Sequence, residues 1–171
     1  MVAEVFLRSF HATYDFPLAH TDDEVRGWVR DRLLPQMETW VAVDDGDEGV
    51  ADDATERVLG LMTVAPGWLE QLYVDPDHLG EGIGHMLLDL AKQLQPDGLL
   101  LWTFQANARA RRFYERNGFT AIRFGTAWNN EERQPDVQYW WSPTGAPPPP
   151  LEPLKTAPDA LATDPPVPAR D

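Results

Sequence analysis

Leu69–Leu94 reads LEQLYVDPDHLGEGIGHMLLDLAKQL and contains three successive elements. The first apolar run predicts a strand, the DPD sequence breaks it, and the apolar spacing after the last glycine predicts an amphipathic helix. Between strand and helix lie Gly80, Gly82 and Gly84. Glycines let the backbone approach a ligand closely, and the free amides at a helix start attract anions. This stretch therefore predicts a phosphate-binding site.

The neighbouring segments predict an α/β domain over residues 1–141. Helices are expected at 21–34, where Pro35 ends the helix, and from Asn107 to Asn117-Gly118, while residues 4–16 form a short helix or an irregular lead-in. The further strands are expected at 39–43, 58–64, 99–104, about 120–128 and 136–141. The run LLLWTF at 99–104 is too apolar for an edge strand and predicts a central one. This order of elements predicts a mixed sheet.

Two segments have an unusual composition. Ten of the sixteen prolines lie between Pro143 and Pro168, so residues 142–171 are predicted to be a mobile or polyproline-like tail. The tail is either passive or a docking motif for a proline-recognition module. The acidic run between the strands at 39–43 and 58–64 is either a solvated hairpin loop or a site for a cation or partner.

Composition excludes several classes of function. The net charge of -14 argues against nucleic-acid binding, which needs a basic face. The chain has no cysteine, and its four histidines lack metal-ligand spacing, so no metal site is expected. Neither a signal peptide nor a transmembrane run is visible, which predicts a cytoplasmic protein without membrane contact.

The glycine turn departs from the two common nucleotide fingerprints. No Lys-Ser/Thr pair follows the glycines, as a P-loop requires, and His85 stands where the dinucleotide fingerprint needs its third glycine. A second block, NARARRFYERNGF, occupies Asn107–Phe119. Together, the two blocks resemble the pyrophosphate-binding and second coenzyme A motifs of the GNAT superfamily of acetyl-coenzyme A-dependent N-acetyltransferases. The resemblance covers roughly Thr39 to Trp141.

This resemblance implies a GNAT-like α/β fold, with a mixed, mostly antiparallel sheet, splayed central strands and flanking helices. The acyl group enters the gap between those strands, and the amine arrives from the other side. The positions implied in binding acetyl-CoA are Leu72, Tyr73, Val74, Leu79, Gly80, Glu81, Gly82, Ile83, Gly84, His85, Asn107, Ala110 and Phe113. The family usually has Gln or Arg at the position of Leu79, so weaker coenzyme binding is expected. Its usual first strand is also not visible, so either the chain begins late or another segment supplies that strand.

The chemistry of acyl transfer selects two further residues. An alkylammonium must lose a proton before its nitrogen attacks a thioester, and Glu70, on the strand before the glycine turn, is the candidate base. Alternatively, Glu70 pairs with an arginine or faces solvent. Tyr114 matches the position that serves as general acid in many family members, or it is a buried aromatic residue under the coenzyme. Glu131 and Glu132 either attract a cationic substrate or form a polar turn.

The sequence therefore predicts an N-acetyltransferase that moves an acetyl group from acetyl-CoA to a primary amine of a small molecule, peptide or protein. Because no cysteine is present, direct transfer through a ternary complex is favoured over an acyl-enzyme. The alternative is a non-catalytic coenzyme A-binding or scaffolding domain with a proline-rich interaction tail. An unpaired last strand near Tyr139 would also allow a homodimer.

Overall fold

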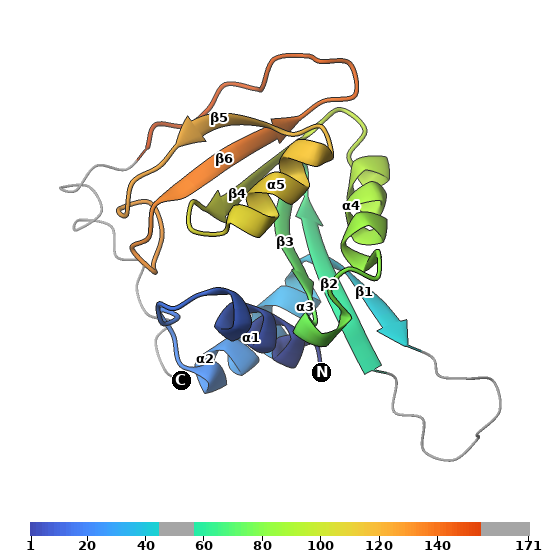
Figure 1. The fold of residues 1–171 in the computed structure, drawn as a ribbon, viewed down its shortest axis with the longest axis vertical. Coiled ribbons are helices and arrows are strands. Elements are labelled where there is room, and N and C mark those ends of the chain that lie inside the picture. The colour runs from blue at the N-terminus through green and yellow to red at the C-terminus, as the bar shows by residue number, and fades with distance from the viewer. Residues whose placement is uncertain (45–56, 155–171) are drawn as a thin grey trace.

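The computed structural model describes residues 1–44 and 57–154 (Figure 1). The acidic loop and the end of the proline-rich tail, about which the sequence left alternatives open, lie outside these described residues. The helices are α1 (Val2–Thr13), α2 (Asp22–Trp28), α3 (Leu34–Gln36), α4 (Ile83–Leu94) and α5 (Ala108–Arg116). The strands are β1 (Glu38–Asp44), β2 (Arg57–Ala65), β3 (Trp68–Val74), β4 (Leu99–Phe104), β5 (Thr120–Phe124) and β6 (Asp136–Trp141).

Six strands form one sheet in the order β1-β2-β3-β4-β6-β5. Every neighbouring pair is antiparallel except β3 and β4, which run parallel. The expected mixed, mostly antiparallel sheet is therefore confirmed. The apolar strand β4 lies between β3 and β6, as its sequence predicted, and Leu99, Leu100 and Leu101 are buried.

The parallel strands β3 and β4 pair at only one position. Trp68 lies opposite Leu100, and the Leu100 amide donates to the Gly67 carbonyl at 2.8 Å. By contrast, β4 pairs with β6 along its whole length, from Leu99 to Phe104. The two central strands therefore separate toward their carboxyl ends, which confirms the splay.

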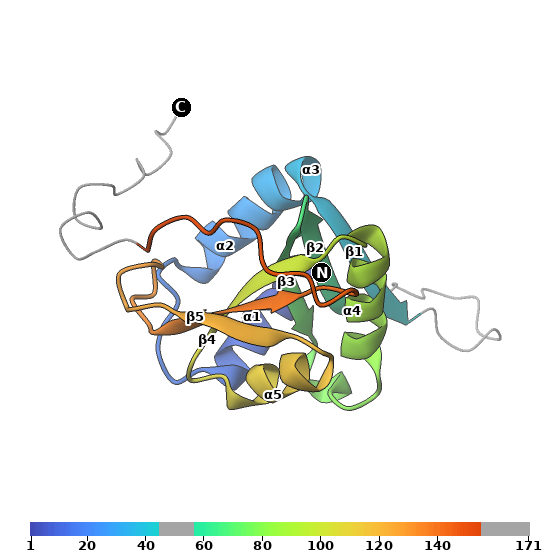
Figure 2. The same ribbon diagram turned by 90° about the horizontal axis from the view of Figure 1, so that it is seen from above.

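Helices cover both faces of the sheet (Figure 2). Adjacent strand residues point to opposite faces, and two neighbours on β2 show which helix lies on which face. Leu61 packs in a cluster with Val5 of α1, while Met62 packs in another cluster with Leu87 and Leu88 of α4. Consequently α1 and α4 cover opposite faces, and the end of β3 lies between them.

The structure corrects two predicted boundaries. The second helix does not end at Pro35, because a π-helical turn at Val29–Leu33 is followed by the short helix α3, in which Pro35 occupies the first turn. An amide at that position has no partner within a helix, so proline is tolerated there. The fifth strand also stops at Phe124 rather than near Trp128, where the chain turns.

The prediction that the last strand, near Tyr139, is unpaired and could pair across a homodimer was wrong. The last strand, β6, is not an edge strand, because β5 folds back onto it and β4 pairs along its other side. The edges of the sheet are β1 and β5. Within residues 1–44 the first element is α1, and β1 follows α3.

The described part of the proline-rich tail contacts the sheet. Trp140 Nε1 donates to the Ala146 carbonyl at 2.8 Å, and the Arg123 guanidinium donates to the Glu152 carbonyl. Separately, no helix within residues 1–44 and 57–154 combines the length and apolar character needed to cross a membrane.

Gly60 on β2 lies directly beneath α4. A Cβ there would meet Ile83 Cγ2 at 2.9 Å and the Tyr73 carbonyl oxygen at 3.1 Å. Gly60→Ala is therefore expected to lower the free energy of unfolding by about 1–3 kcal/mol, since overpacking costs that much. Gly27→Ala in α2 is the control, because its nearest neighbour is 4.0 Å away. Urea denaturation of both variants checks this, and equal stability would contradict the close packing of α4 on β2.

Candidate active site

A pocket of about 320 Å³ opens in the gap between β3 and β4. Its walls come from α1, α2, β3, β4, α5 and the connection between β5 and β6. The lining residues are Phe6, Ser9, Phe10, Thr13, Tyr14, Leu18, Trp28, Leu69, Glu70, Gln71, Leu72, Tyr73, Trp102, Thr103, Phe104, Asn107, Ala110, Tyr114, Asn130, Glu132 and Asp136. Within residues 1–44 and 57–154, the lining includes three carboxylic residues and no arginine, lysine or histidine.

The glycine turn between β3 and α4 has the geometry of an anion cradle. Gly80 and Gly82 have φ values of 94° and 89°, a backbone conformation that side chains rarely adopt. The space where their Cβ atoms would lie is open. Helix α4 starts immediately afterwards, and its first amides have no partner inside the helix. The turn therefore offers accessible amide donors with the positive end of the helix dipole behind them.

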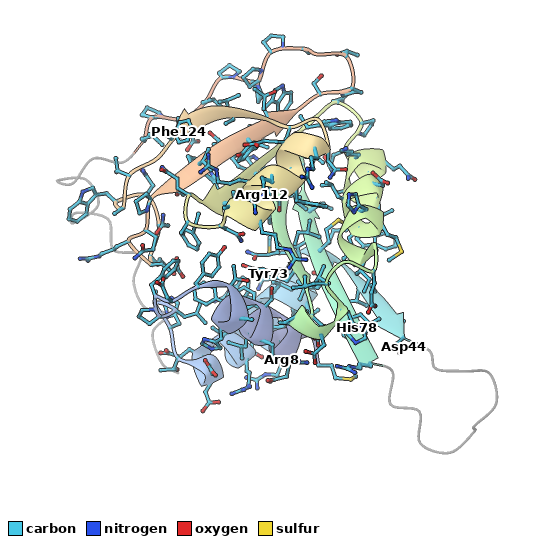
Figure 3. All side chains as sticks on the ribbon, in the orientation of Figure 1. Arg8, Asp44, Tyr73, His78, Arg112 and Phe124 are labelled. Carbon is cyan, nitrogen blue, oxygen red and sulfur yellow. The ribbon has the colours of Figure 1, made fainter. Side chains whose placement is uncertain are left out.

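Asp75 anchors the start of this turn. Its buried carboxylate accepts from Arg8 of α1 at 2.6 Å and from the Asp77 amide at 3.0 Å, while its own amide donates to the Leu59 carbonyl at 2.7 Å. Arg8, labelled in Figure 3, also donates to Asp77 at 2.8 Å. These bonds tie the end of β3 to α1 and β2, so the glycine turn begins from a fixed point.

The structure brings the two sequence blocks together where α4 meets α5. A Cβ on Gly84 would lie 3.7 Å from both Phe113 and Val74, and the rings of His85 and Phe113 are 5.0 Å apart. Leu79 is exposed at the start of the turn, and His78 pairs with Glu81 at 3.0 Å. Leu72, Tyr73, Asn107 and Ala110 line the pocket, whereas Leu79 to His85 and Phe113 lie outside its lining.

Glu70 lines the pocket from β3. Its carboxylate makes no hydrogen bond or ion pair within the described residues, so the alternative of pairing with an arginine there is not realised. The residue remains open to solvent, but partial burial raises the pKa of the Glu70 carboxyl. A free carboxylate of this kind can accept a proton from a group in the pocket.

Tyr114 lines the same pocket from α5 and is buried. Its ring packs 5.6 Å from Phe119 and 6.0 Å from Tyr139. Burial, and to a lesser extent Tyr14, raises the pKa of Tyr114 above its ordinary value. The phenol is therefore protonated at neutral pH and able to donate a hydrogen bond.

Tyr14, at the end of α1, is a pocket residue that the sequence did not identify. Asn107 Nδ2 donates to its hydroxyl oxygen at 2.9 Å, while Asn107 Oδ1 accepts from the Ala110 amide at 2.9 Å as the N-cap of α5. Asn107 thus joins α1 to α5 across the pocket. The sequence offered only the helical spacing of Phe10 and Tyr14 as a signal, because the contact with Asn107 spans 93 positions.

The connection between β5 and β6 separates the two glutamates that the sequence grouped. Glu131 pairs with His20 at 2.9 Å, away from the pocket lining, whereas Glu132 lines the pocket. Asp136, read from sequence only as the start of a strand, also lines it and is 5% exposed. Burial raises the pKa of Asp136, and a hydrogen bond from Asn130 partly offsets that rise.

Within residues 1–44 and 57–154, no three or more His, Cys, Asp or Glu side chains cluster so that they could hold a metal ion.

The family model described as Acetyltransferase (GNAT) domain matches residues 35–121. Peptidyl-lysine N-acetyltransferase YjaB of Salmonella typhimurium is 36% identical over 115 residues, which cover 67% of this chain and 72% of that protein. Peptidyl-lysine N-acetyltransferase YjaB of Escherichia coli is 32% identical over 115 residues, which cover 67% of this chain and 71% of that protein. The solution structure of apo-form YjaB from Escherichia coli matches with a TM-score of 0.64 and 26% identity, covering 82% of this chain and 88% of that chain.

Proposed function

This chain belongs to the GNAT superfamily of acetyltransferases, and from that premise we propose that it moves an acetyl group from acetyl-CoA directly to a primary amine. The amine is the lysine side chain of a peptide or protein. The observation that carries the proposal is the unpaired Glu70 carboxylate in the pocket between the splayed strands, with Tyr114 lining the same pocket.

The glycine turn fits the pyrophosphate of a coenzyme A thioester. Its two positive-φ glycines leave open space, and the start of α4 supplies amide donors. The main chain therefore provides the binding groups, although Leu79 stands where the family usually has Gln or Arg. Main-chain groups of Leu72, Tyr73 and Val74 at the open edge of β3 bind the pantetheine arm. Bound there, acetyl-CoA supplies a thioester carbonyl as the electrophile.

Glu70 acts on the proton of the acceptor amine, and Tyr114 acts on the departing thiolate. Glu70 takes a proton from the acceptor ammonium, which frees the nitrogen lone pair for attack on the thioester carbonyl. As the carbon–sulfur bond breaks, Tyr114 donates a hydrogen bond to the departing thiolate. Full proton transfer from a phenol with a raised pKa to a thiolate near pKa ~8.5 is uphill, so Tyr114 acts mainly by stabilising the developing charge. The second proton that the nitrogen loses as the amide forms passes to the thiolate, directly or through solvent, and coenzyme A leaves as the thiol.

The relatives named above support the choice of acceptor, because both are called peptidyl-lysine N-acetyltransferases. The pocket suits a lysine side chain, since aromatic rings of Phe6, Phe10 and Tyr14 can pack against its methylene groups and carboxylates can receive its ammonium.

Calorimetry and mass spectrometry test this function. We expect the purified chain to bind acetyl-CoA and to add one acetyl group to a lysine-containing peptide with release of free coenzyme A. A matched peptide with acetyl-lysine in place of lysine is the control and should remain unchanged. Coenzyme binding without transfer to any of a broad panel of primary amines would favour a non-catalytic coenzyme A-binding domain. Absence of binding would contradict both functions.

The glycine turn gives a separate prediction. Gly82→Ala forces a side chain into a left-handed conformation at the N-cap of α4. We expect about a tenfold rise in the KM for acetyl-CoA, because a hydrogen bond to a charged group contributes about 1.5–3 kcal/mol. Gly145→Ala is the control, since Gly145 also has positive φ and open space but lies beyond β6. Equal KM values for the two variants would exclude the turn from coenzyme binding.

A further inference from the structure

We propose that Glu132 binds the positive charge of the acceptor as it enters the pocket, so that the site selects alkylammonium acceptors over neutral amines. The inference rests on the proposed function and adds the residue that determines specificity for the acceptor. It assigns Glu132 a role in binding, distinct from the proton transfer at Glu70.

The two adjacent glutamates of the β5–β6 connection have different surroundings. The Glu131 carboxylate lies 2.9 Å from His20 Nε2, and its side chain is 59% exposed. The Glu132 side chain is half-buried, lines the pocket, and has no hydrogen-bond or ion-pair partner within the described residues. Of the two, only Glu132 presents a free carboxylate to a ligand in the pocket.

Among the described residues, no arginine, lysine or histidine lines the pocket to neutralise Glu132. The field of its carboxylate reaches the pocket walls, because it adds to the rise in the pKa of Tyr14 that burial mainly causes. Glu70, which lines the same pocket from β3, likewise has no hydrogen-bond or ion-pair partner within the described residues. Two free carboxylates in a partly desolvated pocket attract a cation more strongly than they would in bulk water, and they repel anions.

The turn that carries Glu132 is held in place by hydrogen bonds. Asn130 Nδ2 donates to the Gln134 carbonyl at 2.7 Å and to Asp136 at 3.0 Å, and Asn130 Oδ1 accepts from the Gln134 amide at 3.0 Å. Arg133 adopts a φ of 52°, a conformation uncommon for a residue with a side chain. These bonds fix the backbone of the turn from which the Glu132 side chain extends.

The base of the turn is also anchored. Gln105, just after β4, donates from Nε2 to the Asp136 carbonyl at 2.8 Å and to the Gly125 carbonyl at 3.2 Å, and its amide donates to the Pro135 carbonyl at 2.9 Å. The Asp136 side chain accepts from Asn130 through Oδ2, whereas its Oδ1 is buried and has no hydrogen-bond partner in the part of the chain that the structure describes. This oxygen faces Gly125 and is closed off from solvent, so Glu132 is the carboxylate that this part of the pocket offers to a ligand.

Aromatic residues of the pocket complete a site for an alkylammonium. Phe6 and Phe10 of α1, Trp28 of α2 and Phe104 of β4 line the pocket together with Tyr14. Aromatic faces accommodate methylene groups and attract cations. An acceptor with an apolar stem and a charged end, such as a lysine side chain, therefore matches both the aromatic rings and the free carboxylates of the pocket.

Steady-state kinetics with a lysine-containing peptide test the proposal. For Glu132→Gln we expect the peptide KM to rise about tenfold while kcat stays within about twofold and the KM for acetyl-CoA is unchanged, the pattern of lost ground-state binding. Glu132→Asp should recover part of the loss. Glu131→Gln is the matched control and should behave like the wild type.

Salt dependence separates charge recognition from a structural effect. Raising ionic strength should increase the peptide KM of the wild type and of Glu131→Gln, and should affect Glu132→Gln less, because screening acts on a charge that this variant lacks. Equal KM values and equal salt dependence for Glu131→Gln and Glu132→Gln would overturn the proposal while leaving the acetyltransferase function intact. Failure of the wild type to acetylate any amine would instead refute the proposed function.

Discussion

Glu70→Gln is expected to lower kcat/KM for the acceptor amine by about 10²–10³-fold at neutral pH, within the range that loss of a general base produces. The amide cannot take a proton from the ammonium, so the reaction depends on the small fraction of acceptor that is already neutral in solution. Lysine side chains have a pKa near ~10.4, which makes that fraction small at neutral pH. Initial rates of coenzyme A release measure the effect.

The same variant has an expected effect on stability that serves as its control. Because partial burial raises the pKa of Glu70 in the folded protein, ionisation disfavours the folded state as pH rises through that pKa. At neutral pH the neutral Gln removes this penalty, so Glu70→Gln should have a Tm equal to or above that of the wild type. A lower Tm together with the lower rate would mean that Glu70 acts through the fold instead of through the reaction.

Tyr114→Phe is expected to lower kcat by about 10²-fold, since one donor to the developing charge is removed. The raised pKa of Tyr114 keeps its phenol protonated from acidic to mildly alkaline pH, so the rate loss should be nearly constant over that range. Tyr114 lines the pocket and not the glycine turn, so binding of acetyl-CoA measured by calorimetry should change little.

Tyr139→Phe is the matched control for this variant. Tyr139 is fully buried next to Tyr114, but its hydroxyl donates to Glu115 at 2.7 Å and does not line the pocket. Its loss should cost about 1 kcal/mol of stability, as for a typical hydrogen bond, and leave kcat near the wild-type value. If Tyr139→Phe and Tyr114→Phe reduced kcat equally, packing of the aromatic cluster would explain both results.

The fold was largely predictable from local patterns. The apolar run of β4 correctly predicted a central strand, and the glycine turn correctly predicted a strand followed by a helix. These predictions depend on periodicity and on backbone freedom, which short stretches of sequence record directly. Pro35 was misread because a π-helical turn, which has no clear sequence signal, shifts the helix so that proline falls in a first turn.

The site was predictable only where neighbouring residues define it. Glu70 and Tyr114 were identified from chemistry and from two sequence blocks, and both line the pocket. Glu131 and Glu132 have the same side chain and adjacent positions, so only their contacts separate them. Tyr14 was missed because its partner Asn107 lies far along the chain, and Asp136 because a strand residue gives no sign of its environment.

The pH dependence of kcat/KM for wild type and Glu70→Gln, measured side by side at saturating acetyl-CoA, tests the assignment of Glu70 as the base most directly. For the wild type, kcat/KM should rise and then level off above a carboxyl pKa that is higher than the ordinary value of ~4.3, and stay level through neutral pH. For Glu70→Gln, it should instead keep rising about tenfold per pH unit toward the pKa of the amine itself, so the two curves converge at alkaline pH. Parallel curves, with the same shape and a constant ratio, would contradict proton transfer to Glu70.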